Sequence, residues 1–129
     1  MINIFIIIKS FFVKRLQSFG YAFRGLSVFF QTQIHAKIHV LIAFFVILLG
    51  FLLQIVWYEW ALLIFAIGLV LSAEAMNTAI EFLTDLVSPN YNEKAGKVKD
   101  IAASAVLLTA ITAILIAMLV FIPKFMRIW

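Results

Sequence analysis

The sequence contains no cysteine, few charged residues and few glycines, and each shortage excludes a class of protein. Without cysteine the chain has no disulfide scaffold, no thiolate metal site and no cysteine nucleophile. Only 12% of the 129 residues are charged, about half the share found in soluble domains. This composition excludes an ordinary globular domain, a disordered chain and a nucleic-acid-binding module, although the formal net charge is +4.

The five glycines, at positions 20, 25, 50, 68 and 96, never cluster. The nucleotide-binding loops of P-loop and Rossmann proteins need closely spaced glycines, because their backbone approaches the phosphates directly. The sequence has neither loop. Any phosphate group that the protein binds is therefore held by side chains and a metal ion.

Hydrophobic residues are abundant, at 66% of the chain, and the mean hydropathy is +1.16. This is the composition of an integral membrane protein. A helix rises about 1.5 Å per residue, so about 20 apolar residues cross the hydrocarbon of a bilayer. The uncharged runs 38–58 and 101–123 are long enough, and they predict membrane-crossing helices at about 38–57 and 98–122.

The crossing between these two, which is the second along the chain, has to include charged residues. The uncharged run 60–73 is too short to span a bilayer. The helix must therefore continue past Glu74 until Ser88 and Pro89 stop it. We expect this crossing at about 60–87.

Lysine and arginine gather on one side of these crossings, which orients the chain. The link between the first two crossings has no cation, and its Trp57, Tyr58 and Trp60 suit an outer headgroup belt. Lys124 and Arg127 fall on the other side and oppose this orientation, but they are two cations against eight on the cytoplasmic side. We expect a multi-pass protein with a cytoplasmic amino terminus. The eight cations on the cytoplasmic side are Lys9, Lys14, Arg15, Arg24, Lys37, Lys94, Lys97 and Lys99.

The amino-terminal segment, at about 10–34, has the pattern of an amphipathic helix. Its apolar residues recur at intervals of three and four, from Phe12 and Leu16 onward, while Lys14 and Tyr21 fall on the opposite face. A basic amphipathic helix lies in the membrane interface with its apolar face in lipid. The sequence therefore predicts an all-α membrane protein, a single domain over 1–129, with one interfacial helix and three crossings.

Three carboxylates and one amide share a face of the second crossing. At about 100° per residue, Glu74, Asn77, Glu81 and Asp85 fall within an arc of about 80°. A charged residue inside a bilayer costs at least about 2.5 kcal/mol, so such residues are usually functional. Measured from Trp60 at the outer interface, Glu74 is about 21 Å and Glu81 about 31 Å along the helix. Glu74 is then in the inner leaflet and Glu81 at the cytoplasmic boundary.

This gradient of depth suggests phosphoryl transfer to a lipid. A buried carboxylate such as Glu74 can act as a general base, and Glu81, assisted by Asp85, can hold a hard divalent cation. Lys99 and its neighbours open the third crossing and supply positive charge for phosphate. Two other interpretations stay open: a structural network that joins the helices, and an ion or proton pathway in an oligomer without catalytic activity.

Small residues on the third crossing indicate assembly. Ala102, Ala105, Thr109 and Thr112 or Ala113 are spaced by three and four, which permits close helix contact. Three crossings alone cannot shield the polar face from lipid. We therefore expect a homotrimer.

The same region carries a family resemblance. The residues that carry it are the run Ala73-Glu74-Ala75-Met76-Asn77-Thr78-Ala79-Ile80-Glu81, the later Asp85 and the segment Ala95-Gly96-Lys97-Val98-Lys99-Asp100-Ile101-Ala102-Ala103-Ser104-Ala105-Val106. Together they resemble the bacterial integral-membrane diacylglycerol kinase and undecaprenol kinase family. The likeness extends to about residues 14–122, because it also includes Phe19-Gly20-Tyr21-Ala22-Phe23-Arg24-Gly25-Leu26 and Ile38-His39.

The resemblance implies a trimeric lipid kinase of the inner (cytoplasmic) membrane. Such an enzyme transfers phosphate from ATP, with Mg²⁺, to the hydroxyl of diacylglycerol or undecaprenol, giving phosphatidic acid or undecaprenyl phosphate. By the resemblance Glu74 is the general base and Glu81 is the metal and nucleotide ligand. The other implied nucleotide-site residues are Lys14, Tyr21, Asn77, Asn90, Tyr91, Asn92, Lys99 and Asp100.

Two positions depart from the family pattern. Gln33 stands where the family commonly has a glutamate metal ligand, and His35 stands where the family often has an asparagine. An amide oxygen coordinates Mg²⁺ without supplying charge, so the metal then depends more on Glu81. His35 and His39 are four residues apart, but no further ligand spacing supports a zinc site. No residue decides between the two lipid acceptors.

Overall fold

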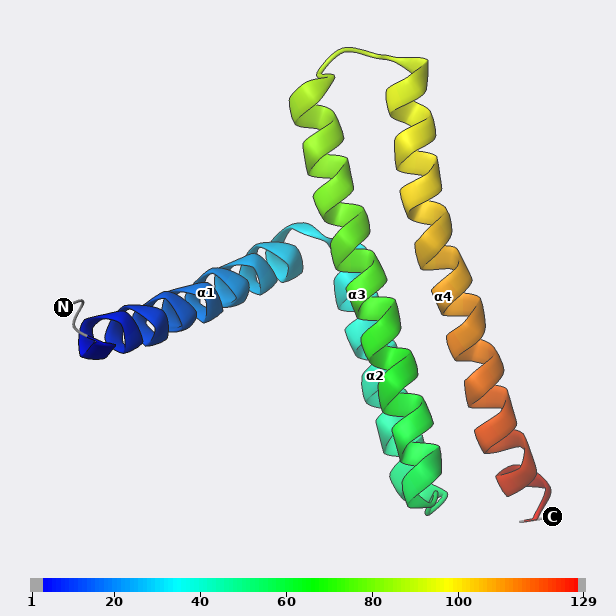
Figure 1. Ribbon diagram of the computed structural model, residues 1–129. Helices are drawn as coiled ribbons and strands as arrows, with labels where there is room; N and C mark the ends of the chain where they lie inside the picture. Colours follow the sequence, from blue (N-terminus) through cyan, green and yellow to red (C-terminus); the bar gives the residue numbers. More distant parts are fainter. Residues whose placement is uncertain (1–3, 128–129) are drawn as a thin grey trace. The chain divides into compact units, whose positions relative to one another are not determined.

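The computed structural model describes residues 4–127, which form four helices in two units (Figure 1). The first unit holds α1 (Ile4–Thr32), and the second holds α2 (Ile34–Leu52), α3 (Trp57–Val87) and α4 (Glu93–Met126). The helices α2, α3 and α4 are each long and apolar enough to cross a membrane. The predicted all-α fold with three membrane-crossing helices is confirmed.

Helix α1 begins six residues before the expected start, because no helix-breaking residue separates the apolar run 4–8 from the amphipathic segment. It ends at Thr32, two residues earlier than expected. The Thr32 hydroxyl donates to the Val28 carbonyl at 2.8 Å, and the Gln33 amide donates to the Phe29 carbonyl at 3.0 Å. These bonds complete the last turn.

The turn between α2 and α3 starts earlier than the sequence indicates, since α2 ends at Leu52. Gln54 has a φ of 49°, in the left-handed region, and reverses the chain. The Ile55 amide then donates to the Gly50 carbonyl at 3.2 Å. A Cβ on Gly50 would lie 2.8 Å from the ring of Trp60, so any larger residue there would have to displace that ring.

Helices α3 and α4 run side by side as an antiparallel hairpin, and α2 packs on α3 (Figure 1). In α3, 33% of the most apolar stretch is buried, against 11% in α2 and in α4, so α3 is the most enclosed of the three. A core cluster of Ile55, Leu63, Val120 and Phe121 fills the end of the hairpin next to the α2–α3 turn.

Ion pairs join α3 to α4 at both ends of the hairpin. Asp85 pairs with Lys99 at 2.5 Å beside the connecting loop, and Glu59 pairs with Lys124 at 2.9 Å at the other end. The second pair exists because α4 continues for one turn beyond Pro123, to Met126, where the sequence predicted an end near 122. Within residues 34–127 these pairs are the side-chain polar contacts between α3 and α4. The threonine hydroxyls bond to carbonyls of their own helices, at Thr78, Thr84, Thr109 and Thr112.

Candidate active site

One face of α3 changes from apolar to polar along its length. Leu63, Ala66 and Val70 are buried on it, and Glu74 and Asn77 continue the same face at helical spacing. Glu74 is 4% exposed and Asn77 is 9% exposed. Glu74 and Asn77 are thus enclosed within this unit, so the expectation that three crossings cannot shield the polar face is wrong for these two residues.

Burial decreases along this face toward the α3–α4 loop. Glu81, two turns after Glu74, is partly buried, and the Asp85 side chain is 63% exposed. Glu74 is thus the most buried carboxylate of this face, and the depth of these residues in the bilayer stays a prediction.

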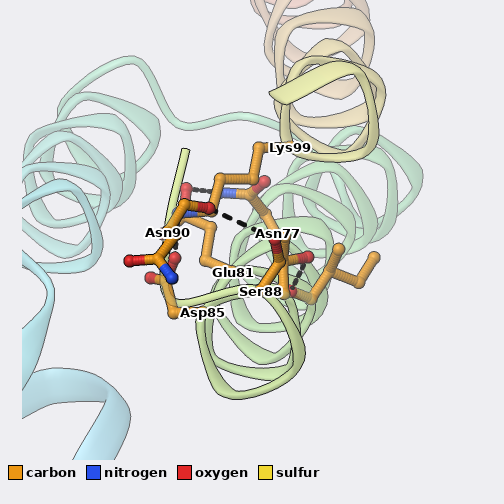
Figure 2. Close-up of polar contacts among 8 residues, drawn as sticks. Asn77, Glu81, Asp85, Ser88, Asn90 and Lys99 are labelled. Atoms are coloured by element: carbon orange, nitrogen blue, oxygen red, sulfur yellow. Dashed lines mark hydrogen bonds and ion pairs between the residues drawn. The ribbon is translucent and has the colours of Figure 1, made fainter. Parts of the chain in front are cut away.

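Asn77 has one satisfied and one unsatisfied polar atom. Its Nδ2 donates to Glu81 Oε1 at 3.0 Å, a contact drawn in Figure 2. Its Oδ1 is buried and accepts no hydrogen bond from the residues that the structure describes. An unsatisfied buried acceptor costs about 1–3 kcal/mol, and such an atom in a native structure calls for an explanation. Asn77 lies between Glu74 and Glu81 along this face of α3. Its Oδ1 can accept a hydrogen bond from a ligand or from a metal-bound water.

Lys99 brings a positive charge to this face from α4. Its side chain reaches across to α3, where Nζ lies 2.5 Å from Asp85 Oδ1 (Figure 2). The Lys99 side chain is 37% exposed, so its ammonium is also accessible to a ligand. Asp100 is exposed on the next position of α4 and takes part in no ion pair among residues 11–127.

The α3–α4 loop contains the three residues expected to cover a nucleotide. Tyr91 is 97% exposed, and the Asn90 carbonyl accepts a hydrogen bond from the Ser88 hydroxyl at 3.3 Å. Asn92 caps α4, because its Oδ1 accepts from the Lys94 and Ala95 amides at 2.9 and 3.4 Å. This cap is not among the features expected from the sequence, although an asparagine directly before the helix start is its usual signal. Nucleotide contact by all three residues stays a prediction.

Lys14, Tyr21 and Gln33 belong to the first unit. Lys14 and Tyr21 are exposed on α1. The Lys14 carbonyl accepts from the Ser18 hydroxyl at 2.9 Å. The structure describes this unit by itself, so the nucleotide contacts of Lys14 and Tyr21 and the metal role of Gln33 stay predictions.

The donor atoms around Glu81 suit a metal ion that arrives with its own ligands. Within residues 4–127 no group of three or more His, Cys, Asp or Glu side chains could hold a metal. Mg²⁺ in nucleotide sites keeps several waters and is held by one or two carboxylates together with phosphate oxygens. The Glu81 carboxylate and the free Asn77 Oδ1 are hard oxygen donors of this kind.

An apolar groove of about 540 Å³ continues the α3 face toward the α2–α3 turn. It lies between α2, α3 and α4, and His39 is the one titratable side chain in its lining. Small side chains create it, and hydropathy alone did not reveal it. The alanines that line it are Ala43, Ala66, Ala110, Ala113 and Ala117.

Residues 20–121 match the family model for prokaryotic diacylglycerol kinase. The chain belongs to this family. It is a lipid kinase of the prokaryotic diacylglycerol kinase family and a multi-pass membrane protein. The resemblance found in the sequence is confirmed, although Lys14 lies before the matched segment.

Individual family members give the degree of similarity. An undecaprenol kinase from Bacillus subtilis (strain 168) is 35% identical over 108 residues, 84% of this chain and 88% of the relative. A diacylglycerol kinase from Synechocystis sp. is 38% identical over 114 residues, 88% of this chain and 65% of the relative. The diacylglycerol kinase of Escherichia coli (strain K12) is 26% identical over 104 residues, 81% of this chain and 85% of the relative.

Proposed function

We propose that this lipid kinase transfers the γ-phosphoryl group of ATP to the hydroxyl of diacylglycerol or undecaprenol at the cytoplasmic interface. The products are phosphatidic acid or undecaprenyl phosphate. The observation that carries the proposal is the buried face of α3, where the unsatisfied Asn77 oxygen stands between Glu74 and Glu81.

Glu74 is the proposed general base. It is the most buried carboxylate on the face, so it can meet the hydroxyl of a lipid away from bulk water. It takes the proton of the lipid hydroxyl as the oxygen attacks the γ-phosphorus, and the β-phosphate of ADP leaves on the opposite side.

Asn77 and Glu81 form the proposed nucleotide and metal end of the site. The Asn77 amide fixes the Glu81 carboxylate through the 3.0 Å hydrogen bond. Mg²⁺, when bound with the nucleotide, supplies charge neutralisation on the phosphates. The Asn77 Oδ1 then accepts a hydrogen bond from the bound ligand or its waters.

Lys99 is the proposed phosphate ligand. Without nucleotide its ammonium pairs with Asp85, and this exposed pair is weak enough to exchange for a phosphate oxygen. Phosphoryl transfer depends mostly on positioning and charge neutralisation, so a side-chain ammonium replaces the glycine-rich loop that the sequence lacks. Asp100, Lys14, Tyr21 and the loop residues Asn90, Tyr91 and Asn92 complete the proposed nucleotide site.

We also propose a homotrimer in the inner membrane with a cytoplasmic amino terminus. Ala102 packs inside the chain and is 7% exposed, whereas Ala105 and Thr112 of the same small-residue set are exposed on α4. These two positions leave a surface where another copy's helix can approach closely.

An assay with radiolabelled ATP tests the activity and the acceptor together. Purified protein in mixed micelles receives Mg²⁺ and equal amounts of diacylglycerol and undecaprenol. We expect one phosphorylated lipid to predominate, and Glu74→Gln to reduce its formation at least 100-fold, the usual contribution of a general base. Glu93→Gln is the matched control, because Glu93 is an exposed carboxylate paired with Lys97. Phosphorylation of neither lipid by the folded protein would contradict the proposal and favour the ion-pathway interpretation.

A further inference from the structure

Positive charge in this protein is concentrated in α1. Residues 1–58 contain five of the ten lysines and arginines and none of the six acidic residues, since the first acid is Glu59. Four of these five cations lie within α1. A helix with this charge can have no intrahelical ion pair, so its cations are available to an external anion.

The apolar face of α1 is uncovered within its own unit. Phe12, Leu16, Phe19 and Phe23 are between 62% and 70% exposed. At about 100° per residue they fall within an arc of about 60°. Nothing within the first unit covers this stripe, so it requires an apolar medium such as membrane lipid.

The two arginines of α1 flank that stripe, one on each side. On the same helical projection Arg15 and Arg24 lie between the apolar stripe and the opposite face, and Lys14 and Tyr21 lie at the centre of the opposite face. In a helix lying in the interface, the flanking positions are at headgroup depth and the opposite face is in water. The arginines therefore lie at headgroup depth, although Arg24 remains in contact with the ring of Tyr21 on the opposite face.

Both guanidinium groups are held against aromatic rings. Arg15 Cζ is 5.2 Å from the centroid of the Phe11 ring, and Arg24 Cζ is 5.5 Å from that of Tyr21. Such cation–π contacts orient a guanidinium while leaving its N–H donors accessible. The fork of donors matches two oxygens of a phosphate, which a lysine ammonium does not.

We propose that Arg15 and Arg24 bind the phosphate groups of anionic lipids, so that docking of α1 depends on the negative charge of the leaflet. Each juxtamembrane cation near an anionic surface strengthens binding about fivefold. If the proposed function holds, the reaction converts a neutral lipid into an anionic one. The product therefore strengthens the docking of α1 as it accumulates.

A fluorescence experiment on the full-length protein tests this without turnover. The chain has no cysteine, so Ser27→Cys accepts a single environment-sensitive fluorophore beside the apolar stripe. The labelled protein is reconstituted into phosphatidylcholine vesicles without phosphatidylglycerol and with increasing fractions of this anionic lipid. We expect a blue shift that grows with phosphatidylglycerol and disappears at about 1 M salt, where the Debye length is about 3 Å.

The variant R15Q/R24Q removes both proposed lipid ligands and is the decisive test. R127Q is the control for loss of an arginine outside α1. The double variant should need much more phosphatidylglycerol for the same shift, with an apparent docking constant about 25-fold weaker, while R127Q follows the parent. A double variant that follows the parent overturns the proposal. An unchanged shift with a raised KM for ATP also overturns it and assigns the arginines to the nucleotide. Absence of kinase activity would contradict the proposed function and leave the fluorescence result intact.

Discussion

Asn77 is the residue whose hydrogen bonding most clearly indicates a missing ligand. Its Nδ2 is bonded to Glu81, and its Oδ1 is buried and unsatisfied in the described chain. A residue selected for stability alone would not leave a buried acceptor without a donor. The arrangement fits a site that is completed when nucleotide and lipid bind.

The first prediction concerns Asn77→Leu. The substitution loses one hydrogen bond, worth about 1 kcal/mol, and removes an unsatisfied acceptor that costs about as much. We expect the thermal unfolding midpoint in detergent to stay the same or rise, while kcat falls at least 100-fold. An amide with a purely structural role would give the reverse pattern, with the midpoint lowered and turnover kept.

A second prediction separates Lys99 from its neighbour Lys97. Lys99→Met should raise the KM for ATP about tenfold or more, because a charged hydrogen bond to phosphate contributes about 1.5–3 kcal/mol. Lys97→Met should leave the KM unchanged, since Lys97 is 68% exposed and pairs with Glu93 on its own helix. Steady-state kinetics with varied ATP measure both. Equal effects of the two variants would mean that overall charge, not the Lys99 position, attracts the nucleotide.

A third prediction follows from the glutamine at position 33. By its family position Gln33 is a metal ligand without charge, so Gln33→Glu should lower the Mg²⁺ concentration for half-maximal activity. Gln33→Leu should raise that concentration and leave the lipid dependence unchanged. Mg²⁺ titrations of the three proteins decide the matter. Identical titrations would remove Gln33 from the metal site and would weaken the family alignment of α1 on which Lys14 depends.

At the scale of elements, the α3–α4 hairpin is fixed in register by its two ion pairs. The pair near the α2–α3 turn is the more buried one, with Glu59 and Lys124 side chains 14% and 17% exposed. Glu59 also accepts from the Val56 amide at 2.8 Å at the start of α3. Displacement of α4 along α3 would break both pairs and move Lys99 away from the polar face.

The fourth prediction tests this register. Lys124→Met leaves the partly buried Glu59 carboxylate without its partner and should lower the thermal unfolding midpoint. The exchanged pair E59K/K124E should recover most of that loss, apart from the hydrogen bond to Val56, which contributes about 1 kcal/mol. Thermal unfolding in detergent micelles measures the difference. No recovery in the exchanged pair would show that packing, and not charge pairing, holds this end.

The elements themselves were largely predictable from the sequence, and their ends were not. Long apolar runs and the helical spacing of Glu74, Asn77 and Glu81 determine which segments cross and which face is polar, because both signals are local. The early end of α2 was missed because the left-handed residue is Gln54, which is not a typical turn residue. The Glu59–Lys124 pair was missed because it joins residues far apart in the sequence, and Lys124 was counted only as evidence against the orientation.

At the scale of the whole molecule, most apolar surface is left for other molecules to cover. Only 11% of the apolar stretches of α2 and α4 is buried within the chain. Lipid can cover such a surface, and so can another copy of the chain. Native mass spectrometry from detergent should give a trimer. An active monomer would contradict the proposed assembly.

The two ion pairs also bear on how the protein enters a membrane. They lie at opposite ends of a hairpin that crosses the bilayer twice, so in either orientation one pair has to be translocated through the hydrocarbon during biogenesis. A lone charge at the bilayer centre costs about 2.5–3.5 kcal/mol on insertion scales. Transferring Glu59 and Lys124 as a neutral pair lowers this barrier, but only if α3 and α4 have already met. We therefore expect the two helices to insert together, so that a ribosome stalled before Lys124 emerges leaves α3 incompletely inserted.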